Sequence, residues 1–242
     1  MSAAPFWRAL LDFFLPAKCP LCGLSPGSPI PDHPCPACLS QIKFFSSPRC
    51  LRCGIGFPSP SDSDHLCSEC LTEERHFSRA RAVCGYEGVI MEAISRLKYG
   101  GLTRLATPLG NLLAEYRDPD FSLSDNDLLI PVPLHPRRLR ERGFNQSLLL
   151  ARQVSRRRSI PINFTALQRA RQTHPQTQLS GAERRKNVGG AFDVKKKEAV
   201  EEKKILLIDD VFTTGATVQE CANVLRKAGA SEVQVLTLAR VA

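Results

Sequence analysis

The chain has 242 residues, of which 43% are hydrophobic and 24% charged, enough for a buried core of one medium domain and an appendage. This composition is typical of a soluble globular protein and excludes a largely disordered chain. The net charge of +9 is concentrated, because residues 137–204 hold 18 Lys/Arg against 6 Asp/Glu. That basic segment is compatible with binding of nucleic acid or a polyphosphate, and equally with a solvated surface.

The first 17 residues carry an apolar stripe, formed by Phe6, Leu10, Leu11 and Phe14, that predicts a docked helix. The stripe is too short to cross a bilayer, and it lacks the small-residue cleavage site of a signal peptide. We therefore expect a cytoplasmic protein without a membrane span.

Residues 18–76 contain four C-x-x-C pairs and are expected to form a small zinc-binding region. The pairs are Cys19 and Cys22, Cys35 and Cys38, Cys50 and Cys53, and Cys67 and Cys70. Two such turns complete a closed tetrahedral site, so the spacing predicts about two structural zinc ions, with a secreted disulfide framework as the alternative. Sequential and interleaved pairings of the turns use the same residues and are both possible. In a segment this short, metal binding would supply much of the folding free energy.

Residues 77–242 alternate between predicted strands and predicted helices. Strands are expected at 80–88, 128–134, 162–167, 191–194, 205–208 and 233–238, and helices at 89–101, 104–117, 144–158 and 217–228. This alternation favours an α/β domain whose mostly parallel sheet is covered by helices on both faces. A ligand of such a domain binds at the carboxyl ends of the strands. The two remaining cysteines, Cys84 and Cys221, are predicted to be buried free thiols.

The most specific motif is ILLIDDVFTTGATV, residues 205–218. Asp209 and Asp210 follow four aliphatic residues, at the edge where an open sheet binds ligands. The next helix opens with five residues whose amides and hydroxyls suit one phosphate: Thr213, Thr214, Gly215, Ala216 and Thr217. The motif lacks both the Walker lysine and the dinucleotide G-x-G-x-x-G pattern. The paired acids suit ribose hydroxyls or a hydrated magnesium ion, whereas a plain Thr-capped helix would not need them.

An acidic pair followed by a phosphate turn resembles the signature of type I phosphoribosyltransferases. The C-x-x-C pairs, LKYGG, PVPLHPRRLRERGFNQS, RARQTHPQTQLSGAERRKN and the acidic motif also follow the order of the ComF/GntX family. This resemblance covers nearly the whole chain. It implies a zinc-binding region joined to a phosphoribosyltransferase-like domain over residues 77–242, in a family associated with natural competence and the use of incoming DNA.

The resemblance also implies roles for individual residues around a magnesium complex of phosphoribosyl pyrophosphate (PRPP). The ribose is expected on Asp209 and Asp210, and the 5-phosphate on residues 213–217. The pyrophosphate is expected near three arginines of a loop, Arg137, Arg138 and Arg142. The expected catalytic residues are Asp209, Asp210 and Arg171, the last in a loop that closes over substrate. Weaker candidates for the cleft and its loop are Lys98, Tyr99, His135, Asn145, Thr173, Gln176, Arg184 and Asn187.

Two functions follow from these expectations. The first is phosphoribosyl transfer from magnesium-PRPP to an unidentified acceptor, in support of DNA uptake or the use of incoming DNA. The second is a non-catalytic adaptor that uses the pocket to bind a nucleotide or a strand end, with single-stranded DNA and a competence helicase as partners. Stacking aromatics, which proteins that bind single strands use, are scarce in the basic loop 169–187.

Overall fold

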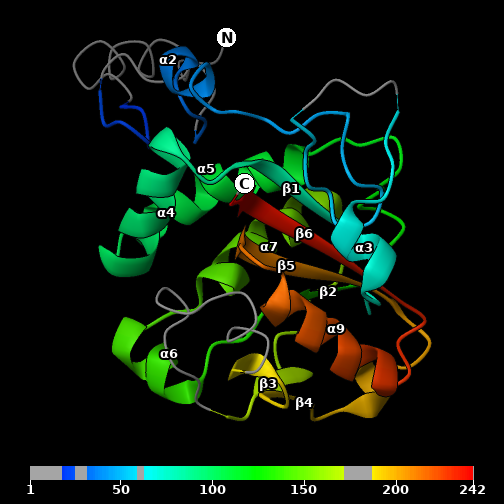
Figure 1. The fold of residues 1–242 in the computed structure, drawn as a ribbon. Helices are drawn as coiled ribbons and strands as arrows, with labels where there is room; N and C mark the ends of the chain where they lie inside the picture. Colours follow the sequence, from blue (N-terminus) through cyan, green and yellow to red (C-terminus); the bar gives the residue numbers. More distant parts are fainter. Residues whose placement is uncertain (1–17, 25–31, 59–62, 172–186, 242) are drawn as a thin grey trace, which may run out of the picture.

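The computed structural model describes residues 18–24, 32–58, 63–171 and 187–241 (Figure 1). The helix predicted over residues 1–17 lies outside the described residues. Within the described ranges, none of the helices has the length and apolar character that crossing a membrane requires.

The core is a sheet of four parallel strands in the order β1-β6-β5-β2 (Figure 1). The strands are β1 (Arg79–Gly85), β2 (Leu128–Pro131), β5 (Lys204–Phe212) and β6 (Glu232–Arg240). The two central strands, β5 and β6, are nearly continuous runs of buried residues. Continuous burial is expected of strands that are covered on both faces.

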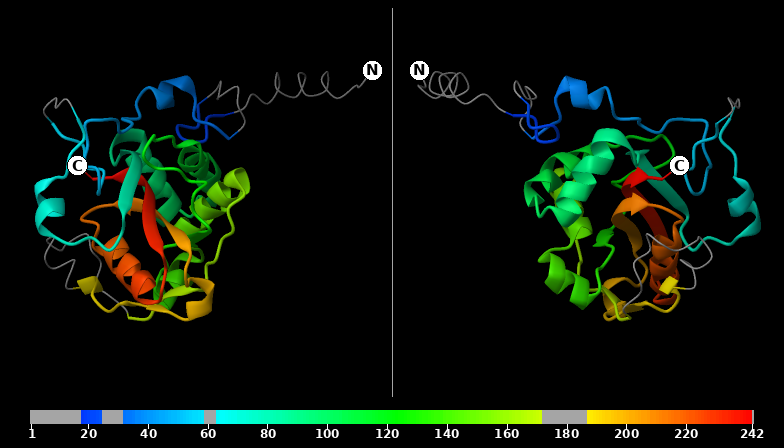
Figure 2. Two further views of the ribbon diagram at one scale, coloured as in Figure 1. Left: turned by 90° about the vertical axis from the view of Figure 1, so that its right-hand side faces the viewer. Right: turned by 60° about the vertical axis from the view of Figure 1, so that its left-hand side comes forward.

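Helices cover both faces of this sheet (Figure 2). On one face, α4 (Gly88–Tyr99), α5 (Ala106–Glu115) and α7 (Gln146–Arg158) share a core with strand residues such as Leu206 and Leu236. On the other face, α9 (Ala216–Lys227) shares a core with the alternate residues of the same strands, such as Leu207 and Val235. The predicted α/β class, with a parallel sheet flanked by helices, is confirmed. Cys84 and Cys221 are fully buried, as predicted.

Several local elements differ from those expected. Residues 162–166 form no strand: Ile162 makes one isolated bridge to Leu129, and β3 (Leu167–Arg169) pairs antiparallel with β4 (Phe192–Val194). The predicted helix 104–117 divides into a 3-10 turn, η1 (Thr103–Leu105), followed by α5. A second 3-10 turn, η3 (Lys197–Ala199), lies between β4 and β5.

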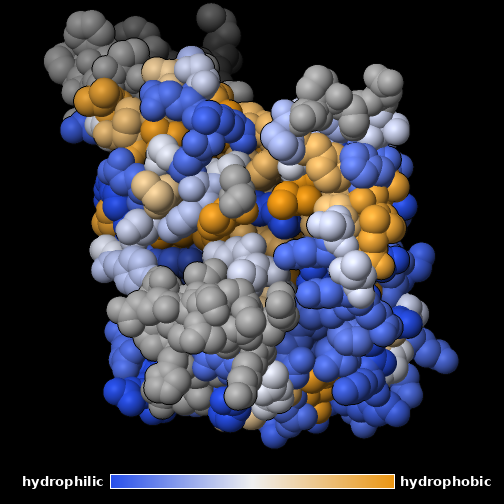
Figure 3. Space-filling view, viewed as in Figure 1, coloured by the Kyte–Doolittle hydropathy of each residue, from blue (hydrophilic) through white to orange (hydrophobic). Residues whose placement is uncertain are grey.

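The cysteine-rich region contains two short helices, α2 (Pro36–Leu39) and α3 (Ser68–Thr72), and covers the open edge of β1. Phe44 bridges Cys84 in antiparallel fashion, and the Ala80 amide donates to the Arg52 carbonyl at 2.7 Å. These contacts pair backbone groups of the edge strand β1 that could otherwise pair with another chain. Apolar side chains also reach the surface over this region, whereas the surface over α9 is hydrophilic (Figure 3).

A buried ionic cluster fastens the cysteine-rich region to the sheet. The Asp118 carboxylate accepts from Arg49 Nη2 at 2.7 Å and from Arg81 Nε at 2.8 Å. The Tyr116 hydroxyl donates to the same carboxylate at 2.9 Å. Arg49 belongs to the cysteine-rich region and Arg81 to β1, so one carboxylate joins the two parts of the chain.

Candidate functional site

A cleft of about 670 Å³ opens at the carboxyl ends of the strands, where the sequence places its acidic motif. Eight of the predicted binding residues line this cleft: Asp209, Asp210, Thr213, Gly215, Thr217, Arg137, Arg138 and Arg142. Lys98, Tyr99 and His135 line it as well. Thr214, Ala216, Asn145 and Arg171 are not among the lining residues.

The two acids lie inside β5, because its pairing with β6 continues to Phe212 and Arg240. They are therefore buried, not exposed beyond the strand end as the sequence suggested. Ser147 Oγ donates to Asp209 Oδ1 at 2.8 Å, and Gln146 Nε2 lies 3.3 Å from Asp210 Oδ1. Lys98, near the end of α4, forms an ion pair with Asp210.

The surroundings of Asp209 and Asp210 shift the pKa values of the two carboxyls in opposite directions. Burial, together with the charge of Asp210, raises the pKa of Asp209 to about 7. Burial also acts on Asp210, but the charge and hydrogen bond of Lys98 outweigh it and lower the pKa of Asp210. At neutral pH Asp210 is therefore ionised, whereas Asp209 titrates in this range. Such a pair is suited to hydrogen bonds with hydroxyl groups.

The turn before α9 is shaped by a glycine. Gly215 is the N-cap of α9 and has φ 75°, a left-handed conformation that glycine adopts without strain. A Cβ at this position would lie 2.5 Å from the Phe212 ring, so only a hydrogen fits. The helix begins directly after this turn, so its N-terminus, which favours an anion, lies at the edge of the cleft.

The basic segment after β2 is a short helix, α6 (Pro136–Arg142), where the sequence suggested a loop. His135 caps it, since its Nδ1 accepts from the Arg137 amide at 3.2 Å. Arg137 pairs with Glu141 at 2.9 Å, on the exposed surface. The Arg142 guanidinium lies 5.4 Å from the centre of the Tyr99 ring and donates to Gln146 at 2.5 Å. Arg142 thus connects the cleft mouth to the residue that contacts Asp210.

Asn145, a weaker candidate, and Arg171, an expected catalytic residue, both make structural hydrogen bonds. Asn145 caps α7, accepting from the Ser147 amide at 3.0 Å and donating to the Val132 carbonyl at 3.0 Å. Arg171 donates to the carbonyls of Asn187 and Gly189 at 3.0 and 2.7 Å. Its predicted catalytic role remains a prediction, and Thr173, Gln176 and Arg184 lie outside the described residues.

Gln146, Ser147 and Arg169 are among the lining residues of the cleft that were not predicted. Gln146 and Ser147 occupy the first turn of α7, which faces the acidic pair. The sequence FNQS could have indicated them, because the polar residues Gln146 and Ser147 precede the apolar residues of this helix. Arg169 is near the end of β3, its guanidinium is 5.3 Å from the Phe192 ring, and burial lowers its pKa.

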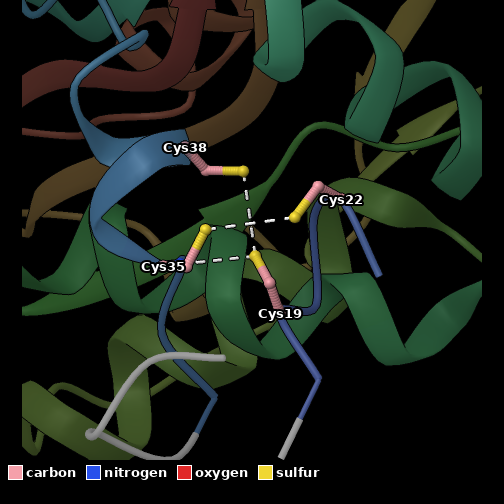
Figure 4. Close-up of side chains that lie close together, drawn as sticks. All are labelled: Cys19, Cys22, Cys35 and Cys38. Carbon is pink, nitrogen blue, oxygen red and sulfur yellow. Dashed lines mark hydrogen bonds between the residues drawn. The ribbon is translucent and has the colours of Figure 1, made fainter. Parts of the chain in front are cut away.

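The eight paired cysteines form two clusters of four. Each cluster brings its sulfur atoms within 4.8 Å of one another. Figure 4 shows the side chains of the first cluster, Cys19, Cys22, Cys35 and Cys38, pointing toward one another. The second contains Cys50, Cys53, Cys67 and Cys70, so the pairing is sequential. Backbone amides donate to the sulfurs, from Cys35 to Cys19 at 3.3 Å and from Cys67 to Cys50 at 3.4 Å. Such all-sulfur sets fit closed, structural zinc sites, in agreement with the prediction.

Two family models match separate parts of the chain. Residues 10–88 match the family model of a double zinc ribbon domain, and residues 145–242 match that of a phosphoribosyl transferase domain. The sheet with its cleft is therefore a phosphoribosyltransferase-type fold, as the sequence predicted.

Known relatives define the family. The DNA utilization protein YhgH of Escherichia coli O157:H7 is 36% identical over 165 residues, which cover 67% of this chain and 72% of that protein. The chain belongs to the ComF/GntX family. Competence protein F of Haemophilus influenzae is 41% identical over 115 residues, 47% of this chain and half of that protein. Competence protein ComFC of Bacillus subtilis is 32% identical over 167 residues, 66% of this chain and 63% of that protein.

Solved structures include the glutamine PRPP amidotransferase of B. subtilis in complex with ADP and GMP. It is 24% identical with a TM-score of 0.37, and the match covers 55% of this chain and 25% of that one. The fold assignment rests on the family match and on the sheet, not on this similarity.

Proposed function

We propose that the cleft binds magnesium-PRPP and that the protein transfers its phosphoribosyl group to an acceptor. The single observation that carries this proposal is the buried pair Asp209 and Asp210, followed within one cleft by the Gly215 turn. Carboxylates that accept from ribose hydroxyls, with a helix N-terminus for a 5-phosphate, are the complement of a phosphoribosyl group.

The remaining residues of the cleft suit the other half of PRPP. Arg137, Arg138 and Arg142 line the same cleft, and their planar, forked donors suit the oxygens of a pyrophosphate. The bond from ribose C1 to the pyrophosphate oxygen would break as the acceptor's nucleophile bonds to C1. Pyrophosphate leaves with the bonding electrons, and fixed positive charge stabilises it.

Carboxylate oxygens are hard ligands, so Asp209 and Asp210 also fit a hydrated magnesium ion. When bound, magnesium would neutralise charge on the pyrophosphate. Asp210 is already paired with Lys98, so this chain's own cation holds that carboxylate ionised and in place. The names of the relatives, competence protein and DNA utilization protein, support a role in the uptake or use of incoming DNA.

The test of turnover is release of pyrophosphate from PRPP and magnesium across a panel of acceptors, starting with the nucleobases. The expected result is release with at least one acceptor, and loss of that release in the Asp209→Asn variant. Release that persists unchanged in Asp209→Asn would show that the described cleft does not carry the reaction.

A second candidate, the single-stranded DNA adaptor, is favoured by one further observation. Arg104, Arg152 and Arg156 line a hollow of about 640 Å³ beside α7. Arg157 and Arg158 instead form hydrogen bonds with α5, at Asn111 and the Ala114 carbonyl.

The adaptor function predicts that affinity for single-stranded DNA falls with salt, with a slope of log affinity against log salt near 0.7 per phosphate neutralised. It also predicts that neutralising Arg104, Arg152 and Arg156 together impairs DNA uptake while Asp209→Asn does not; the reverse result supports phosphoribosyl binding.

A further inference from the structure

The second cysteine cluster makes a direct contact with the end of the central sheet. Arg240, the last residue of β6, is buried, and its Nη1 donates to the Cys53 carbonyl at 2.8 Å. Its Nη2 lies 3.9 Å from Cys53 Sγ. Figure 2 shows the C-terminal end of β6 beside the cysteine-rich region. A guanidinium so placed stabilises the negative charge that four thiolates bring to a zinc ion.

The same guanidinium supports the residue beneath the phosphate turn. It lies 4.3 Å from the centre of the Phe212 ring, and Arg240 and Phe212 are register partners in the paired strands β6 and β5. Phe212 is buried and meets Phe77 edge-on, with ring centres 6.5 Å apart. Its ring is therefore held from two sides.

The Phe212 ring in turn sets the position of Gly215. A Cβ on Gly215 would lie 2.5 and 2.8 Å from two atoms of the ring, so the turn rests directly on it. Because close-packed interiors transmit small displacements, a shift of the ring would move the amides of the turn. Cys53, Arg240, Phe212 and Gly215 thus form one line of contacts from a zinc ligand to the cleft.

We propose that the second cysteine cluster is a positioning element for the phosphate turn, acting through Arg240 and Phe212. Zinc at Cys50, Cys53, Cys67 and Cys70 would fix the Arg240 guanidinium, and the guanidinium would fix Phe212 under Gly215. Zinc occupancy and phosphate binding are then coupled, and the coupling is reciprocal. The inference rests on the proposed function, since it requires that a phosphoribosyl ligand binds this turn.

The direct test measures zinc release from the intact protein to a colour-forming chelator, with and without saturating ribose 5-phosphate. The expected result is that the sugar phosphate slows release of one of the two zinc ions about fivefold or more, as a typical coupling would. Removal of that zinc should in turn weaken ribose 5-phosphate binding. Unchanged release in a protein that does bind ribose 5-phosphate overturns the inference and leaves the proposed function standing.

Two matched variants locate the coupling. Arg240→Met should abolish the protection of zinc and weaken ribose 5-phosphate binding. Arg75→Met removes an arginine that contacts Cys70 of the same zinc cluster and pairs with Glu69 and Glu73, outside the line of contacts to Gly215. Its zinc release should change equally with and without ribose 5-phosphate, so the protection factor and ribose 5-phosphate binding should stay as in the parent protein. Equal effects of the two variants would overturn the proposed route. If Arg240→Met does not fold, the chelator experiment on the parent protein decides alone. Absence of any ribose 5-phosphate binding in the parent protein would overturn the proposed function and the inference together.

Discussion

Lys98, the next-to-last residue of α4, forms an ion pair with Asp210 of β5 at the base of the cleft. The lysine side chain is 18% exposed and the aspartate 5%, so the pair is shielded from water. Burial opposes the charge on Lys98, but Asp210 outweighs it and raises the pKa of the lysine. The LKYGG motif thus supplies the cation that keeps one acid of the site ionised.

Replacing Lys98 with methionine should cost about 3–5 kcal/mol, because it leaves a buried carboxylate without its partner. Urea denaturation measures this cost. The double variant Lys98→Met/Asp210→Asn should recover much of the lost stability, because it no longer contains an unpaired buried charge. A double variant as unstable as Lys98→Met would show that the ion pair is not the cause.

Asp209→Asn should stabilise the protein at neutral and alkaline pH. The pKa of Asp209 is raised from 3.8 to about 7, so the folded state holds a proton that the unfolded state has released. The parent protein therefore loses stability as pH rises through this window, and the variant does not. The gain in Tm should be full above pH 7 and vanish towards pH 4. A gain that is independent of pH would contradict the assignment.

Gly215→Ala should destabilise the protein more than the same change at Gly88. Both glycines have positive φ, which costs an alanine about 1–2 kcal/mol, but only at Gly215 would the new Cβ meet a neighbour, the Phe212 ring. Thermal unfolding compares the two variants, and binding of ribose 5-phosphate should weaken only in Gly215→Ala. Equal loss of thermal stability and equal ribose 5-phosphate binding in the Gly215 and Gly88 variants would contradict a tightly packed phosphate turn at Gly215.

Asp118→Asn should cost about 3–5 kcal/mol, because Arg81 would lose its buried carboxylate partner and Arg49 would keep only its longer pair with Asp64, at 3.6 Å. The control is Glu141→Gln, which breaks the exposed pair with Arg137 and should cost less than about 1 kcal/mol. Chemical denaturation gives both values. A small effect at Asp118 would mean that the zinc-binding region is held to the sheet by other contacts.

The sequence predicted the features that depend on local spacing. The C-x-x-C turns, the strand 205–208 and the glycine turn after it need only a few neighbouring residues to be recognised. It missed features that depend on tertiary contacts. Asp209 and Asp210 remain in β5 because β6 continues to pair beside them, and the helical conformation of α6 is fixed by caps at His135 and Gly143.

Other tertiary features had no local signal at all. The partners of Asp118, Arg49 and Arg81, are 69 and 37 residues away along the chain. The contact of Arg240 with Cys53 spans 187 residues. The sequential pairing of the cysteine turns was likewise compatible with the spacing but not required by it.

The most direct test of the proposed site is calorimetric titration of PRPP, with and without magnesium, into the zinc-loaded parent protein and the Gly215→Ala variant. We expect saturable binding of one PRPP per chain that is stronger with magnesium, and at least about tenfold weaker in the variant, a loss of about 1.4 kcal/mol. Binding of equal strength in both proteins, or no binding by the parent protein, would contradict the proposed site.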